Sequence, residues 1–179
     1  MTRTGYALTL ACLLLATPVA SFADNSLLIP ASGRCALEAS DEQLADAIAD
    51  CKQRAQSGDT GAQFELGEFY YSGKRTTQDF GQALYFFEQA SLKGHAAAQH
   101  RLGSMYFNGQ GVPANALQAF IVLKMAAVNG DESALDTADH VEANMPVEQH
   151  RVALQILGQL FRGYMQSVQD SFVDEPPAL

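Results

Sequence analysis

The chain has 179 residues and is acidic, with 20 Asp and Glu against 11 Lys and Arg and a formal net charge of −9. An acidic surface repels phosphate groups, so the composition argues against nucleic acid as a partner. The length suits one domain behind a short leader rather than two domains of ordinary size.

Residues 1–23 are typical of a cleaved signal peptide. Arg3 supplies a positive start, an apolar run follows at 6–20, and small residues precede a cleavage point after Ala23. The apolar run is too short for a membrane anchor. We therefore expect a periplasmic or secreted protein with no integral membrane segment after cleavage, in which residues 24–36 form a linker.

Two cysteines, Cys35 and Cys51, follow the predicted cleavage point. An exported protein meets oxidising conditions, in which such a pair favours a disulfide, and two free thiols are the alternative. The bridge would pin the entry segment across a helix expected at 41–57. In the chain-entropy model a loop of this size contributes about 3 kcal/mol.

A repeat of 36 residues organises the rest of the chain. The stretch AQFELGEFYYSGKR at 62–75 returns as AQHRLGSMYFNGQG at 98–111, and the register continues without a slip to Gly94 and Gly130. Such a period predicts stacked structural units. A glycine recurs inside the first helix of each unit, where we expect two helices to approach too closely for a side chain.

Each unit predicts a pair of helices. The periodicity and the glycine and proline positions give their expected bounds as 60–72 with 79–93, and 96–108 with 115–129. A degenerate third unit follows at 131–172. Its long last helix begins near Pro146, and we expect residues 173–179 to form a tail.

The frame L-G-x-x-Y-x-x-G-x-G-V-P at 102–113 resembles the Sel1-like repeat, a relative of the tetratricopeptide repeats. The resemblance implies an all-α, right-handed α-solenoid of about three helix pairs with a C-terminal capping helix. The repeat domain would cover 37–172, with repeats at about 60–94 and 96–130 and the degenerate unit behind them. The first unit departs from the family frame at Arg75, Thr76 and Thr77, where the family has Gly-Val-Pro.

By analogy with tetratricopeptide stacks, one stripe on the first helix of each unit lines a concave face. Its mixture of aromatic, acidic and imidazole side chains suits a peptide or partner protein. The alternative is that the aromatic residues pack as core. Two of the candidates, His100 and His140, could suggest a metal site, but no third ligand is evident, so we expect none. The candidate residues are Phe64, Glu68, Tyr71, His100, Ser104, Phe107, Asp136 and His140.

The sequence contains none of the common hydrolase, nucleotide or metalloprotease motifs. Members of the Sel1-like repeat family act mostly as scaffolds. The resemblance therefore implies a non-catalytic, exported adaptor that uses no cofactor and binds a peptide or protein in its concave face. One alternative is a binder of cell-wall or β-lactam-type ligands with weak hydrolase activity. Another is an accessory subunit of an envelope assembly that docks by its convex face or C-terminal helix.

Overall fold

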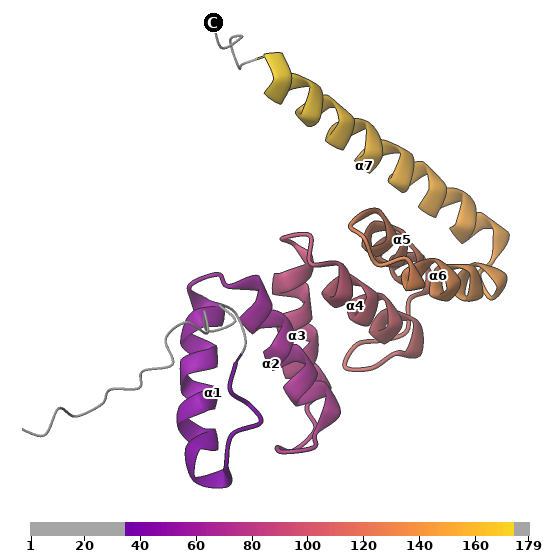
Figure 1. The fold of residues 1–179 in the computed structure, drawn as a ribbon. Helices are drawn as coiled ribbons and strands as arrows, with labels where there is room; N and C mark the ends of the chain where they lie inside the picture. The colour runs from indigo at the N-terminus through magenta and orange to yellow at the C-terminus, as the bar shows by residue number, and fades with distance from the viewer. Residues whose placement is uncertain (1–34, 174–179) are drawn as a thin grey trace, which may run out of the picture. The chain divides into compact units, whose positions relative to one another are not determined.

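The computed structural model describes residues 35–173, and the predicted signal peptide lies outside the described residues. The described part of the chain is all helical (Figure 1). Its helices are α1 (Asp41–Gln56), α2 (Thr60–Ser72), α3 (Phe80–Ser91), α4 (Ala96–Asn108), α5 (Ala116–Val128), α6 (Ser133–Ala143) and α7 (Val147–Val173).

The helices pack as an all-α solenoid of pairs, as predicted. α2 packs on α3 and α4 packs on α5, so each 36-residue unit forms one pair. Successive pairs join through contacts of α3 with α4 and of α5 with α6. The first helices of the units also contact one another in order, α2 with α4 and α4 with α6, which places them in a row.

Side chains at the helix starts cap α2, α3, α4 and α5. Asp59, Asp79 and Asn115 each accept a hydrogen bond from the backbone N–H three residues ahead, which satisfies a donor that the helix leaves open. At α4 this position is His95, whose ring nitrogen accepts from the Ala98 N–H. Burial lowers the pKa of His95, which favours the neutral ring that can accept this bond.

The glycine inside the first helix of each unit is required by close packing. A Cβ at Gly67 would lie 2.5 Å from the Phe87 ring, and a Cβ at Gly103 would lie 2.6 Å from Leu123 Cγ. Phe87 and Leu123 are both fully buried and occupy equivalent positions of the two units. The cost of glycine within a helix is therefore offset by helix–helix packing.

The last helix packs differently from the others. α7 contacts α5 along part of its 27 residues, and Ala153 is buried there. Farther along, Tyr164 is 60% exposed and Met165 is 53% exposed. No helix of the described residues is long and apolar enough to cross a membrane.

Candidate functional site

The row of α2, α4 and α6 carries the predicted concave-face residues. Phe64, Glu68 and Tyr71 come from α2, and residues 100, 104 and 107 come from α4. Asp136 and His140 come from α6, where both are exposed. Contacts between these helices bring most of the candidates together.

An arginine outside the predicted set of concave-face residues joins α2 to α4. Arg101 Nε donates to Glu68 Oε1 at 2.6 Å, and Arg101 Nη2 donates to Glu68 Oε2 at 3.1 Å. The guanidinium also lies over the Tyr71 ring, 5.5 Å from its centroid. The Tyr71 hydroxyl in turn donates to Gln110 Oε1. Because the Arg101 side chain is 48% exposed, this cation remains accessible to a partner.

His100 joins α4 to the start of α6. Asp131 Oδ2 lies 2.9 Å from His100 Nδ1, and Thr137 Oγ1 lies 3.0 Å from His100 Nε2. The Ser133 hydroxyl, followed by His100, holds the pKa of Asp131 below its usual value. The carboxylate–imidazole–hydroxyl order resembles that of a hydrolase triad. Thr137 lies within α6, however, where the helix uses the backbone N–H groups that an oxyanion hole would need.

A small hollow opens between these two clusters. It has a volume of about 290 Å³ and is lined by Phe64, Ala97, His100, Arg101, Ser104 and Asp131. The lining presents a cation, a carboxylate, a hydroxyl and an aromatic edge. Such a mixture can receive one polar side chain or a short stretch of extended backbone.

The aromatic candidates are half-buried. Phe64 stacks on His95, with 4.7 Å between ring centroids, and also packs against Phe87. Phe107 meets His140 edge to face at 5.5 Å. The aromatic residues therefore contribute to packing within the array while part of each remains at the surface.

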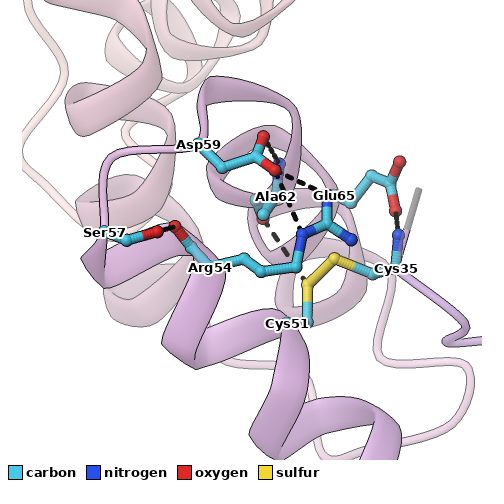
Figure 2. The surroundings of a disulfide bond; sticks show 7 residues. All are labelled: Cys35, Cys51, Arg54, Ser57, Asp59, Ala62 and Glu65. Carbon is cyan, nitrogen blue, oxygen red and sulfur yellow. Dashed lines mark hydrogen bonds and ion pairs between the residues drawn. A yellow bond between two sulfur atoms is a disulfide. The ribbon is translucent and has the colours of Figure 1, made fainter. Parts of the chain in front are cut away.

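The predicted Cys35–Cys51 disulfide is present, with 5.3 Å between the two Cα atoms (Figure 2). Cys51 is fully buried on α1. The backbone N–H of Cys35 donates to the Glu65 carboxylate on α2. The bridge thus ties the entry segment to the first two helices, and a disulfide is typical of proteins outside the cytoplasm.

An ion pair lies next to the bridge. Arg54 Nη2 lies 2.6 Å from Asp59 Oδ2, and Figure 2 shows the two side chains above the disulfide. The hydrogen bond from Arg54 lowers the pKa of Asp59, and the bond from the Ala62 N–H adds to this effect. Asp59 therefore stays ionised as it caps α2.

A second surface, between α5 and α7, is almost entirely apolar. A groove of about 550 Å³ runs along it. Phe161 and Leu154 are half-exposed there, as is Val128 on α5. The groove is lined by Phe120, Lys124, Met125, Ala127, Val128, Leu135, Leu154, Leu157, Gly158 and Phe161. The periodicity of the last helix predicts its apolar positions, but the sequence does not show that they stay uncovered.

Among the described residues, no group of three or more His, Cys, Asp or Glu side chains is arranged to hold a metal ion. The two candidate histidines have other contacts. His100 bonds to Asp131 and Thr137, and His140 contacts the Phe107 ring.

Comparison with protein families identifies two Sel1 repeats, at residues 60–95 and 96–131. These matches coincide with the two units that the 36-residue period predicts. The chain therefore carries Sel1 repeats, as the sequence resemblance implied. Proteins built from Sel1 repeats generally act in protein–protein interaction, and the fold is a typical non-catalytic scaffold.

Solved structures of similar fold are also Sel1-type proteins. The chain is similar to c5321, a protective antigen present in uropathogenic Escherichia coli strains that displays an SLR fold. The TM-score is 0.65 with 25% identity, and the alignment covers 78% of this chain and 31% of c5321. A Sel1 repeat protein from Oxalobacter formigenes gives a TM-score of 0.51 with 26% identity, covering 53% of this chain and 39% of that one. The chain thus spans less than half the length of either protein, and a comparison with curated proteins gave no match.

Proposed function

We propose that this protein is an exported, non-catalytic adaptor that holds an extended segment of a partner protein in the concave face of α2, α4 and α6. One observation carries the proposal: the three helices contact in a row, and α2, α4 and Asp131, just before α6, line the hollow at Arg101 and Ser104. The general role of Sel1 repeats in protein–protein interaction supports it.

The charges of the face indicate the chemistry of the bound segment. Arg101 is paired with Glu68 but half-exposed, so a carboxylate of the partner can share or replace that pair. Ser104 and the exposed His140 and Asp136 offer hydrogen bonds to a peptide backbone. A segment that contains an acidic residue and polar neighbours therefore fits the face better than an apolar one.

Export is part of the proposal and rests on two features. Residues 1–23 have the pattern of a signal peptide, and the Cys35–Cys51 disulfide suits an oxidising compartment. Fractionation of cells that express the chain with a C-terminal tag should place a shortened form, beginning at Asp24, in the periplasm or the medium. A full-length form retained in the cytoplasm would contradict this part.

The concave-face proposal can be tested with a displayed peptide library. Peptides selected on the wild-type protein should lose at least tenfold in affinity on Ser104→Arg, because the new side chain fills the hollow. Gln118→Arg, an exposed position of α5, is the matched control and should bind like wild type. Equal binding by both variants, with unchanged circular dichroism, would rule out this face as the site.

A second candidate function is docking through α7. The specific observation is the half-exposed apolar surface of α5 and α7 around Phe161. From Leu154 to Ser167 the one charged residue in the sequence is Arg162. We propose that the occupant of this surface is an apolar, uncharged helix face of a partner protein. A partner with an acidic surface would be repelled, because this chain is itself acidic.

The variant Leu154→Gln, Phe161→Gln separates the two candidates. Both side chains are half-exposed, so the variant should fold normally while losing a partner that docks on α7. Binding of the selected peptides should be unchanged. Light scattering of the wild-type protein adds a further outcome, because a dimer that this variant dissolves would show that a second copy, rather than a different protein, covers the surface.

A further inference from the structure

A polar hollow lies between α1 and α3, formed by residues that the concave face does not use. Its volume is about 510 Å³, within the range of roughly 300–1,000 Å³ that is usual for small-molecule sites. Two lysines and several amides face it, and none of its lining residues is a carboxylate. Its principal polar and aromatic residues are Lys52, Gln56, Gln63, Tyr85, Gln89 and Lys93.

Gln63 contributes a buried acceptor that has no partner. The residue is 5% exposed, and its Nε2 donates to the Ala55 carbonyl at 2.9 Å. Its Oε1 makes no hydrogen bond within residues 35–173. A buried carbonyl oxygen without a donor costs about 1–3 kcal/mol. A ligand that brings a donor to this atom would recover that cost.

The second repeat shows how the same position is normally satisfied. Gln99 is equivalent to Gln63, and its Nε2 donates to the Ser91 carbonyl in the same way. Its Oε1 accepts from Asn129 Nδ2 at 2.8 Å. The residue equivalent to Asn129 in the first repeat is Lys93, whose Nζ donates to the Gly58 carbonyl instead. The first repeat therefore lacks the donor that satisfies the glutamine oxygen in the second.

The walls of the two junctions differ as well. Tyr85 and Gln89 line the first, whereas Ile121 and Met125 stand at the equivalent positions of the second. Lys52 lies over the Tyr70 ring at 5.8 Å, and in the next repeat its place is taken by Glu88. In a chain of net charge −9, the hollow in the first repeat thus collects two lysines and several amides, whereas the equivalent positions of the second repeat carry a carboxylate and two apolar side chains in place of Lys52, Tyr85 and Gln89.

We propose that this hollow binds a small hydroxylated carboxylate, the chemistry of an acidic sugar. The two lysines attract the carboxylate, and a hydroxyl can donate to the unpartnered Gln63 Oε1. Glutamine amides both donate and accept, which matches hydroxyl groups. Tyr85 is 54% exposed at the rim and offers a flat face for a sugar ring.

The test uses digalacturonate, with its dimethyl ester as the uncharged comparison and an acetylated acidic tetrapeptide as the alternative ligand. Titration calorimetry on the mature full chain should show binding of digalacturonate and at least tenfold weaker binding of the ester. Preference for the tetrapeptide, or no binding of digalacturonate at millimolar concentration, would overturn the proposal.

Variants that copy the second repeat locate the site. Lys93→Asn should supply the missing donor to Gln63 Oε1, remove one of the two cations and reduce binding at least tenfold, with an unchanged circular dichroism spectrum. Lys74→Asn makes the same charge change at an exposed lysine outside the hollow and should bind like wild type. Equal weakening by both variants would show attraction by overall charge alone. Ser104→Arg should leave this binding unchanged, so failure here and failure of the concave-face proposal are distinguishable.

Discussion

The two Sel1 repeats differ in the turn between their helices. In the second repeat, Gly111 has a φ of +75°, and its backbone packs against the Phe80 carbonyl of the preceding repeat. In the first repeat, Arg75 stands at the equivalent position. Its guanidinium donates to the carbonyls of Leu37 and Ala39 and pairs with Asp41.

The difference reflects what precedes each turn. The second turn packs against a neighbouring repeat. A glycine with positive φ allows the close backbone contact that this packing requires. The first turn has the entry segment in that place, which makes a turn at 37–38, and the Arg75 guanidinium donates to the carbonyls of that segment. The departure of residues 75–77 from the family frame is thus an adaptation of a terminal unit.

The largest effect on the free energy of unfolding should come from replacing the glycine that both repeats carry inside their first helix. Gly67→Leu and Gly103→Leu each force a side chain into the helix–helix contact, and each should cost about 3 kcal/mol or more. Urea unfolding followed by circular dichroism measures this cost. If one repeat tolerated leucine while the other did not, the two pairs would not be equivalent in packing.

The next effect is confined to the N-terminal end of the array, in the entry segment and α1 that precede the first repeat. Replacing Cys35 and Cys51 together by alanine opens a loop with a sequence separation of 16 and should cost about 3 kcal/mol in the chain-entropy model. Adding reductant to the wild-type protein gives an independent comparison. An unchanged unfolding midpoint in both experiments would show that the bridge does not stabilise the array.

The two turns should respond differently to alanine. Gly111→Ala meets both a positive φ and the Phe80 carbonyl and should cost about 2 kcal/mol. Arg75→Ala removes hydrogen bonds from a charged donor and should cost about 1 kcal/mol, since the pair with Asp41 is exposed. Limited proteolysis should then cut near residues 35–39 in Arg75→Ala but not in Gly111→Ala.

The smallest effect should depend on pH. His95 caps α4 as the neutral ring, and burial lowers its pKa, so the unfolded chain binds the proton more readily. Its contribution is complete above pH 6.5 and is lost as the pH falls below that value. Melting temperatures at pH 7.5 and 5.5 should therefore differ more for wild type than for His95→Asn, which caps without titrating. An identical difference in both proteins would contradict this role.

Most of the fold follows from the sequence because it is local and repeated. The period of 36 residues gives the helix pairs, and the recurrence of Gly67 as Gly103 gives the close contact. The disulfide was predictable from two cysteines behind a signal-like segment. These inferences need only spacing and residue type.

The contacts of the candidate site could not be predicted in the same way. The pairing of Arg101 with Glu68 joins residues 33 positions apart, and which rotamers meet depends on how the helices stack. The change from Asn129 to Lys93 is visible when the repeats are aligned. Its result, an unpartnered Gln63 beside a hollow, depends on where each side chain points.

The entry segment has a consequence for the order of assembly. Leu37 is buried among Cys51, Leu66 and Phe69, and Arg75 holds its carbonyl oxygen. Because the chain is synthesised from its N-terminus, Leu37 is made before these residues, the last of which is Arg75. The end of the array that is made first is therefore closed only after α2 and the turn behind it have been synthesised.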